Sequence, residues 1–259
     1  MLPHRSIKSL YPLALAEGEG VGTAYEYFAK RLVLAPFLKS IPPPGRLLIA
    51  GLPEKYGSSL DFLLLAEELA VAEVVLIDDR PAALERNRQS LISAQSVGQL
   101  NRVTPQYVLA ADISRLDELN GNFDLCLGSE TLQRLSDSDR AQYVRRISSL
   151  SPVAAVFAPN ADNGHHTTLS GLAGLSREEM RGLVSTRAGV RDVGYIDMPP
   201  FPPGMTRSAA QRSQASSGQV EALAMWGLGW YARMESLFPG AWRRTHSHIV
   251  YALMKKNGA

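Results

Sequence analysis

The chain has 259 residues, of which 45% are hydrophobic, 20% charged and 7% aromatic. This composition is that of a globular protein with a large core, and it excludes a disordered, collagen-like or coiled-coil chain. The formal net charge of +2 is too small to indicate nucleic-acid binding by overall charge. No linker-like stretch precedes residue 200, so we expect residues 1–259 to form a single domain.

Cysteine content and hydropathy favour a cytoplasmic protein. The one cysteine, Cys126, cannot form an intramolecular disulfide, which suits a reducing compartment. The longest apolar run, residues 222–232, is far shorter than the roughly 20 residues that a membrane-spanning helix needs. The apolar stretch Leu10–Ala16 follows basic residues as in a signal peptide, but it is short and contains Pro12. We therefore expect neither secretion nor a membrane partner.

The first 45 residues predict a helical cap. Within 23–40, apolar residues recur at spacings of three and four, which is typical of an amphipathic helix; they are Tyr25, Phe28, Leu32 and Ala35. Pro36 is expected to kink or end this helix, and the run Pro-Pro-Pro-Gly at 42–45 then breaks the chain.

Residues 46–198 alternate between strand and helix patterns. Short apolar runs without polar alternation predict strands buried on both faces; they lie at 46–51, 73–78, 107–111, 123–127 and 153–158. Helices are predicted at 60–70, 81–92 and 136–150, with a capping box of Ser58 and Asp61 at the start of the first. Strands alternating with helices predict a parallel sheet covered on both faces, so the fold class is α/β.

The remainder of the chain adds two strands and a flap. A polar loop, 160–175, precedes a capping box of Ser176 and Glu179 that opens a helix to about residue 185. Further strands are predicted at 190–198 and 246–256. Residues 199–245 form a flap over the sheet with a helix at 220–238, and residues 246–259 carry the last strand.

Acidic residues end two successive predicted strands. Asp78 and Asp79 close the second strand, and Asp112 follows the third. In an open parallel sheet, ligands bind in the crevice beyond the carboxyl ends of the strands. A carboxylate at the second strand can accept both hydroxyls of a ribose, and one at the third can accept an exocyclic adenine amine. The pair therefore predicts a ligand that contains a nucleoside.

At these positions the sequence resembles the class I S-adenosylmethionine-dependent methyltransferases, over roughly residues 23–198 and the last strand. The matching segments are the helix at 23–40, Ala50-Gly51-Leu52, Ile77-Asp78-Asp79, Ala111-Asp112-Ile113 and the stretch 123–135, FDLCLGSETLQRL. The resemblance implies a Rossmann-like, seven-stranded, mostly parallel sheet with helices on both faces, an N-terminal helix, and a C-terminal helical flap before the last strand. It implies a cofactor-binding core at 46–198.

The resemblance also implies S-adenosylmethionine as cofactor. By that resemblance Asp78 would hold the ribose, Asp112 and Ile113 the adenine, and Gly51 the methionine part. The other residues of the expected cofactor site are Leu52, Pro53, Asp79, Gly128 and Ser129. The glycine loop departs from the family pattern, because Ile49 replaces an acid and Leu52-Pro53-Glu54-Lys55-Tyr56-Gly57 follows the first glycine. A non-catalytic protein that keeps the fold is therefore the main alternative.

Two other enzyme classes fit the sequence less well. A nicotinamide enzyme needs a glycine-rich turn that lets pyrophosphate reach a helix N-terminus, and Gly51-Leu52-Pro53 lacks one. A nucleic-acid amino-methyltransferase would carry an Asp/Asn-Pro-Pro-aromatic motif after the fourth strand, where Gly128-Ser129-Glu130 stands. Asp197-Met198-Pro199-Pro200-Phe201 imitates that motif, but it follows the sixth predicted strand.

Histidines near the strand ends are candidates for proton transfer. His165 and His166 lie in the predicted loop after the fifth strand, where an acceptor would sit, and the ordinary pKa of histidine suits a base near neutrality. They are equally interpreted as plain polar loop residues. His246 and His248 would share one face of the last strand, but no clear third ligand accompanies them, so we predict no metal site.

Aromatic residues of the flap and the N-terminal helix are candidates for an acceptor pocket. The 220–238 helix places an apolar stripe at Val220, Leu223, Gly227, Trp230, Met234 and Leu237, flanked by Trp226 and Tyr231. We interpret most of this stripe as packing against the core. Tyr25, Tyr27, Trp226 and Trp230 are the residues that could also contact an acceptor.

The main hypothesis is a cytoplasmic S-adenosylmethionine-dependent methyltransferase that acts on a small molecule. The first alternative is a non-catalytic module that binds a nucleoside ligand or a protein partner. A third possibility, an RNA methyltransferase, rests only on residues 201–259, where seven basic residues face two acidic ones. A solvated basic surface explains that excess at least as well, so we do not expect a nucleic-acid partner. The sequence does not predict an oligomeric state.

Overall fold

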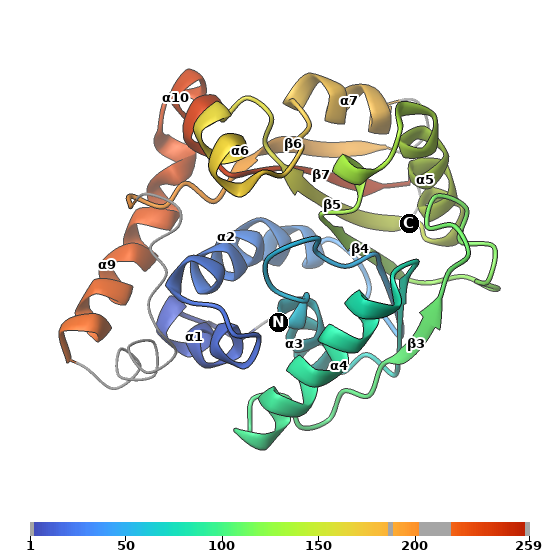
Figure 1. The fold of residues 1–259 in the computed structure, drawn as a ribbon, viewed down its shortest axis with the longest axis horizontal. Helices are drawn as coiled ribbons and strands as arrows, with labels where there is room; N and C mark the ends of the chain where they lie inside the picture. Colours follow the sequence, from blue (N-terminus) through green and yellow to red (C-terminus); the bar gives the residue numbers. More distant parts are fainter. Residues whose placement is uncertain (1–2, 186–188, 202–218, 257–259) are drawn as a thin grey trace.

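A seven-stranded sheet forms the centre of the molecule (Figure 1). The structure is a computed structural model that describes residues 3–185, 189–201 and 219–256. Its strands are Arg46–Ala50 (β1), Glu73–Asp78 (β2), Gln106–Leu109 (β3), Leu125–Ser129 (β4), Val153–Pro159 (β5), Val190–Ile196 (β6) and Ile249–Lys255 (β7). They lie in the order β3-β2-β1-β4-β5-β7-β6. Strand β7 is antiparallel to both of its neighbours, and β1 to β5 are parallel.

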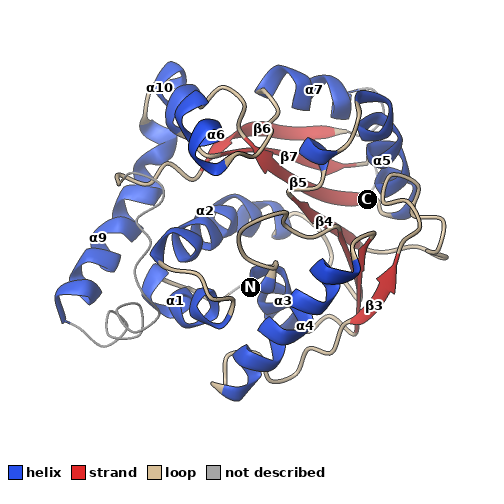
Figure 2. Ribbon diagram, in the orientation of Figure 1, coloured by secondary structure: helices blue, strands red, loops and turns tan. Residues whose placement is uncertain are grey.

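Helices cover both faces of this sheet (Figure 2). The α-helices are Ile7–Ala16 (α1), Val21–Leu38 (α2), Leu60–Glu68 (α3), Pro81–Ser96 (α4), Asp137–Leu150 (α5), Gly164–Ser170 (α6), Arg177–Ser185 (α7), Gln219–Met234 (α9) and Gly240–His246 (α10). Two short 3-10 helices are Leu132–Arg134 (η1) and Glu235–Leu237 (η2). The α/β class and the seven-stranded, mostly parallel sheet are confirmed.

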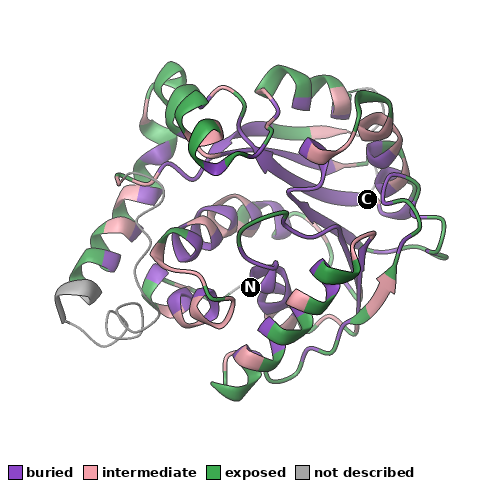
Figure 3. Cartoon of the chain, viewed as in Figure 1, coloured by how far each residue is buried: buried purple, intermediate pink, exposed green. Residues whose placement is uncertain are grey.

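Alternate residues of each central strand face opposite helical layers. Leu47 and Ile49 of β1 belong to a core with α1 to α4 and α9, whereas Leu48 and Ala50 belong to a core with α5 and α7. Both faces are therefore buried, as the purple strands of Figure 3 show. This explains why the strands read as continuous apolar runs in the sequence.

The N-terminal cap contains two helices, one more than predicted. Residues 7–16 form α1, whose N-cap Ser6 accepts a hydrogen bond from Ser9 N. Leu10 and Leu13 of this helix are buried in the core, so the apolar stretch is used for packing. Helix α2 continues through Pro36 and ends at Leu38. No helix in the described ranges is long and apolar enough to cross a membrane.

The predicted capping box at Ser58 and Asp61 is wrong. The N-cap of α3 is Ser59, whose side chain makes no capping hydrogen bond. Instead, the carboxylate of Glu17, from the turn after α1, accepts hydrogen bonds from Ser58 N (2.9 Å), Ser58 Oγ (2.7 Å) and Leu60 N (3.0 Å). A distant acid therefore satisfies the helix N-terminus, which local spacing could not predict. The capping box of Ser176 and Glu179 is confirmed.

The C-terminal third differs from its prediction in three places. Residues 164–170 of the expected polar loop form α6, because the Asn163 side chain caps it by accepting from His166 N at 3.0 Å. The predicted 220–238 helix ends at Met234 and is followed by η2 and α10. The last strand starts at Ile249, because His246 ends α10 and the buried apolar run begins only there. The other predicted ends differ by at most four residues.

The helix of the predicted flap lies beside the N-terminal helices. Helix α9 packs against α1 and α2 (Figure 1). Its buried residues Met225 and Ala232 join the same core as these helices. This part of the 199–245 segment therefore borders the helical layer, where the prediction had a flap over the sheet. Residues 202–218 of the segment lie outside the described residues.

Candidate active site

The carboxyl ends of β1, β2 and β3 bring together most of the residues expected to bind the cofactor. We call this region the β1–β3 edge: Gly51–Pro53, Asp78–Arg80, Asp112 and Ile113, with Arg134 from η1. Gly51 has a φ of 82°, in the left-handed region that favours glycine. A Cβ at Gly51 would overlap with Oγ1 of Thr131. The space beside this glycine is therefore filled by the protein's own threonine.

Asp78 ends β2 and is completely buried. Its Oδ1 accepts hydrogen bonds from N (2.9 Å) and Nε (2.8 Å) of Arg80. Its Oδ2 accepts from Leu52 N (2.8 Å) and from Nη2 of Arg80 (2.9 Å). Burial alone would raise the pKa of Asp78, but the hydrogen bonds and charge of Arg80, with the charge of Arg134, hold that pKa below its ordinary value. Asp78 is thus a fully hydrogen-bonded carboxylate with a lowered pKa.

Arg134 completes a cluster of two arginines and two aspartates. Its Nη1 donates to Oδ1 of Asp79 at 2.7 Å, and its Nη2 lies 3.4 Å from Oδ2 of Asp78. Arg80 also donates from Nη2 to the carbonyl oxygen of Leu52 at 2.7 Å. Leu52 and Pro53 are buried, and Nη2 of Arg86 donates to the Pro53 carbonyl at 2.6 Å. The loop after β1 is therefore held in place by the side chains of Arg80, the N-cap residue of α4, and Arg86, within α4.

Asp112 lies at the outer end of this edge and is exposed. Its Oδ1 accepts from Ser114 N (2.8 Å) and Ser114 Oγ (2.7 Å), and these bonds lower the pKa of Asp112. The next residue, Ile113, is buried in the core that contains α5. Unlike Asp78, Asp112 presents its carboxylate to solvent.

Gly128 and Ser129 end β4, next to β1. A Cβ at Gly128 would lie 2.7 Å from Oη of Tyr143, a buried residue whose hydroxyl donates to the Ala50 carbonyl at 2.7 Å. Packing of Tyr143 therefore explains Gly128. Ser129 Oγ instead accepts a hydrogen bond from Nζ of Lys30 at 3.0 Å. Ser129 thus connects the sheet to α2.

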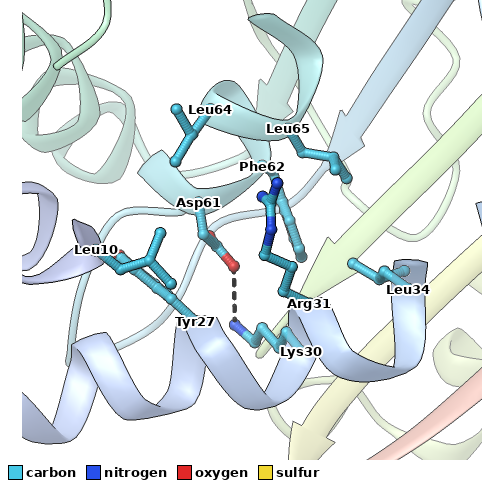
Figure 4. Close-up of a pocket in the computed structure, with 9 residues that line it drawn as sticks. All are labelled: Leu10, Tyr27, Lys30, Arg31, Leu34, Asp61, Phe62, Leu64 and Leu65. Atoms are coloured by element: carbon cyan, nitrogen blue, oxygen red, sulfur yellow. Dashed lines mark ion pairs between the residues drawn. The ribbon is translucent and has the colours of Figure 1, made fainter. Parts of the chain in front are cut away.

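A second group of polar residues lies at the ends of β4 to β7, and we call it the β4–β7 edge: Ser129, Glu130, Asp197 and His248, with Glu26 and Lys30 from α2. Lys30 is only 1% exposed. Its Nζ lies 2.6 Å from Oε1 of Glu26 and 3.9 Å from Oδ2 of Asp61. Figure 4 shows the Lys30–Asp61 pair beside a pocket whose lining comes entirely from α1, α2 and α3. That pocket therefore lies within the helical layer.

Two acids of the β4–β7 edge have left-handed backbone conformations that are rare for residues other than glycine. Glu130 has a φ of 53° and Asp197 a φ of 64°. Such strain concentrates at functional sites, where the surrounding structure maintains it. Burial, with the charge of Glu26, raises the pKa of Glu130 to about 7. Burial also raises the pKa of Asp197.

Asp197 and His248 form a buried acid–histidine pair. Oδ2 of Asp197 lies 3.2 Å from Nδ1 of His248, while Oδ1 of Asp197 has no hydrogen-bond partner within the described part of the chain. Burial alone would lower the pKa of His248, but the charge of Asp197 raises it above its ordinary value. The ring of His166 stacks on that of His248, with centroids 4.1 Å apart. Burial and the neighbouring His248 lower the pKa of His166 to about 4.

The structure separates the predicted histidines and aromatics. His166 belongs to the acid–histidine group, whereas His165 is exposed on α6. His246 ends α10 with Nδ1 3.0 Å from the Trp242 carbonyl, so the predicted shared face of His246 and His248 is wrong. No three His, Cys, Asp or Glu side chains within 3–185, 189–201 and 219–256 are grouped to hold a metal ion.

The four aromatic candidates fall into two unlike pairs. Tyr25 and Tyr27 are buried, and their hydroxyls donate to Glu235 and Glu17, respectively. Trp226 and Trp230 are exposed on the outer face of α9. The pairs therefore do not face one another across a common pocket.

Lys30 and Asp197 were missed as site residues by the sequence predictions, although each carries a signal. Asp197 is the first acid after β6, so the strand-end argument, which selects Glu130 after β4, would also have selected it. Lys30 lies between Tyr27 and Leu34 at spacings of three and four, within the apolar face of α2. A lysine in such a stripe predicts a buried cation.

Comparison with known proteins supports the fold alone. No family model matches the sequence, and no curated protein matches it. Among solved structures, the methyltransferase domain of bacterial CtHen1 matches with a TM-score of 0.52 at 12% identity, covering 88% of this chain and 97% of that one. An S-adenosylmethionine-dependent methyltransferase from Clostridium acetobutylicum ATCC 824 gives 0.51 at 11%, covering 90% and 92%. This chain has the class I methyltransferase fold.

A third solved structure agrees with this fold. The N-methyltransferase NodS from Bradyrhizobium japonicum WM9 matches with a TM-score of 0.51 at 11% identity, covering 89% of this chain and 94% of that one. All three identities are too low to carry substrate or activity to this protein.

The β1–β3 edge can be tested for its fit to the cofactor that the fold implies. Asp112 fits, because its exposed carboxylate can accept a hydrogen bond from an adenine amine. Asp78 is not accessible to a ribose, because Arg80 and Leu52 donate hydrogen bonds to both of its carboxylate oxygens. S-adenosylmethionine therefore fits this edge in the family manner only when the side chains of Arg80 and Arg134 leave Asp78.

Proposed function

We propose that this protein transfers a methyl group from S-adenosylmethionine to a small-molecule acceptor. One observation carries the proposal: in a sheet with the methyltransferase strand order, the adjacent strands β2 and β3 end on Asp78 and lead into Asp112 at the same edge. Two acids so placed suit the ribose and the adenine of a nucleoside ligand.

The chain's own residues divide between cofactor and acceptor in this proposal. Asp78 would hold the ribose once its arginines move, and Asp112 with Ile113 the adenine. The backbone of 51–53 and the end of β4 at 128–129 would hold the methionine part, next to Asp79 and Arg134. When bound, the cofactor supplies an electrophilic methyl group on sulfur.

The β4–β7 edge would serve the acceptor. A hydroxyl or amine acceptor must lose a proton, and a histidine oriented by a carboxylate is suited to take it. Nδ1 of His248 faces Asp197 at 3.2 Å, so Nε2 is the atom that would hold the proton. His166, stacked on His248, would keep that ring in place. His165 is exposed and has no part in this arrangement.

A non-catalytic module is the second candidate, and the Asp78 cluster favours it. In that function the arginine pairs of the β1–β3 edge are permanent, and they stabilise the fold where a cofactor would otherwise bind. The replacement of the family acid by Ile49, which is fully buried in β1, agrees with this alternative.

Calorimetric titration separates the two functions. Wild type, Arg134→Ala and Asp78→Asn are titrated with S-adenosylmethionine and S-adenosylhomocysteine, and NAD is the control ligand. Methyltransferase function predicts that Arg134→Ala binds about tenfold more tightly than wild type, because only Arg80, one of the two arginines beside Asp78, must then move for the ligand to bind. Asp78→Asn should lose binding.

The matched control is Arg88→Ala, which removes an exposed arginine that pairs with Glu85 on α4. Its affinity should equal that of wild type. If neither wild type nor Arg134→Ala binds either sulfonium-derived ligand, the methyltransferase proposal fails and the non-catalytic module stands.

A further inference from the structure

The outer face of α9 and the short helix η2 that follows it carry an apolar stripe that the described residues leave exposed. Its members are Leu223, Trp226, Trp230, Met234 and Leu237, and they are between 47% and 77% exposed. We call them the α9 stripe. The opposite face of the helix, with Met225 and Ala232, packs into the core. Figure 3 shows exposed residues along the outer side of α9. Contiguous exposed apolar surface of this kind marks an interaction site.

The spacing of the α9 stripe is symmetric about its centre. Leu223 and Leu237 lie seven residues before and after Trp230, and Trp226 and Met234 lie four residues before and after it. Two antiparallel copies related by a two-fold axis through Trp230 would therefore pair leucine with leucine, tryptophan with methionine, and Trp230 with itself. Such self-complementarity is what an isologous interface requires.

Gly227 supplies a second, independent feature of the same face. It is exposed, and a Cβ at this position would meet nothing within 4 Å. Glycine inside a helix costs about 1 kcal/mol relative to alanine, and the packing of the described residues does not require a glycine here. Beside Trp226 and Trp230, whose rings contact each other edge to face with centroids 6.1 Å apart, it allows the two helix backbones to approach closely.

The charged side chains near the stripe are directed elsewhere. Arg233 donates to the Gly229 carbonyl at 2.7 Å, and its guanidinium lies 4.7 Å from the ring centroid of Phe28 on α2. Glu235 is buried against Tyr25. A membrane-surface helix would carry lysines and arginines on its polar face. An uncharged stripe rich in tryptophan and methionine is instead typical of the core of a protein interface.

The size of the stripe suits a second copy of the chain. With two exposed tryptophans, two leucines and a methionine, it offers on the order of 600 Å² of side-chain surface, close to the roughly 800 Å² per partner of a standard interface. The neighbouring Trp242 is 40% exposed and extends this area.

From these observations we infer that the α9 stripe is the interface of a homodimer in which two α9 helices pack antiparallel across Trp230. This inference is independent of the proposed methyl transfer, because it uses neither edge of the sheet.

Sedimentation velocity from 1 to 100 µM tests the dimer. Wild type should sediment as a dimer, and Trp230→Glu as a monomer, because each dimer would bury two opposed carboxylates at its centre. Trp230→Ala should raise the dimer dissociation constant about 100-fold, as expected when a central tryptophan is lost from both copies. Ile92→Glu places the same charge at another exposed helix position, on α4, and should remain dimeric.

Thermal unfolding at 1 µM checks that the variants are folded. Their monomers should unfold at about the same temperature as the wild-type monomer, because Trp230 is more than half exposed and contributes little to its stability. Gly227→Ala is a further variant with two opposite expected effects. It should weaken the dimer, because the added methyl group separates the two helices, and it should stabilise α9 in the monomer, because alanine favours a helix.

A wild-type protein that stays monomeric at 100 µM would overturn the inference. So would a dimer that survives Trp230→Glu. Wild type that is monomeric but binds vesicles of phosphatidylcholine and phosphatidylserine, and loses this binding in Trp230→Glu, would overturn it in favour of a lipid surface.

Discussion

The two edges of the sheet hold their charges in opposite ways. At the β1–β3 edge, Asp78 has hydrogen-bond donors on both oxygens, and nearby charges lower its pKa. At the β4–β7 edge, Asp197 has an oxygen without a described partner, and the pKa values of Glu130 and Asp197 are raised. Both acids of the second edge also have left-handed backbone conformations.

This difference indicates that the β1–β3 edge stabilises the fold, whereas the β4–β7 edge is suited to changes in protonation. Paired, permanently ionised groups resist both proton exchange and ligand entry, because each must first lose a partner. Acids near their titration point in strained positions can gain or lose a proton at little cost. The edge that resembles a cofactor site is therefore the more closed one, and the edge with proton-transfer chemistry was largely missed in the sequence.

The largest expected effect is a loss of stability when the hydrogen bonds of the β1–β3 edge are removed. Arg80→Ala removes two side-chain hydrogen bonds from Asp78, those donated by Nε and Nη2, and also the Nη2 bond to the Leu52 carbonyl that holds the loop. Asp78 stays buried with Arg134 as its remaining charged partner, so we expect the free energy of unfolding to fall by about 3 kcal/mol. Urea denaturation at pH 7 measures this change.

Arg88→Ala is the matched control for Arg80→Ala. Arg88 pairs with Glu85 on the exposed surface of α4, and such pairs contribute little. If Arg80→Ala were as stable as Arg88→Ala, the Asp78 cluster would not be the source of stability that the comparison requires.

The next effect concerns pH and the β4–β7 edge. Burial raises the pKa of Glu130 to about 7, and those of Glu17 and Glu235 also to about 7. An acid whose pKa is higher in the folded than in the unfolded chain favours folding at low pH and loses that contribution as the pH rises. We therefore expect the free energy of unfolding to decrease between pH 5 and pH 8, measured by urea denaturation in buffers of equal ionic strength.

Glu130→Gln sharpens this expectation by removing one titrating group. Glutamine can still accept the hydrogen bond from Glu54 N, but it carries no charge to bury. At pH 8 this variant should exceed wild type in stability by on the order of 2 kcal/mol, and near pH 4.5 the two should be equal. Glu178→Gln on the exposed surface of α7 is the control. A gain of equal size at both pH values would contradict the assignment.

The fold could be predicted from the sequence because its signals are local. Apolar runs such as Leu47–Ala50 are buried on both faces, and their alternation with helices determines a parallel α/β sheet. The prediction of a helix start was wrong where a residue distant in the sequence accepts the hydrogen bonds of the backbone N–H groups. Glu17 caps α3 from outside that helix, and no spacing near Ser58 reveals this bond.

The site could be predicted only in part for a related reason. The strand-end argument placed Asp78 and Asp112 at one edge, which the register of β2 and β3 agrees with. It could not show that Arg134, fifty-six residues later in the chain, would occupy Asp78. The exposure of Trp230 likewise depends on which face of α9 contacts α2. Periodicity predicts that the helix has an apolar stripe, but it does not predict whether that stripe faces the core or the solvent.

The smallest expected effect concerns Asp112, the acid of the β1–β3 edge that differs from Asp78 by being exposed. Asp112→Ala removes the proposed adenine contact, which is a single hydrogen bond at the surface worth about 1 kcal/mol, so S-adenosylhomocysteine should bind about fivefold more weakly. Calorimetry on an Arg134→Ala background, where one of the two arginines beside Asp78 is removed, measures this change.

Asp117→Ala, which removes a nearby exposed acid, is the control. Equal affinities of the two variants would mean that the ligand does not reach the end of β3. A loss as large as that of Asp78→Asn would mean that Asp112 positions the loop rather than the adenine alone, because only a structural change could make one solvent-facing contact count as much as a buried carboxylate.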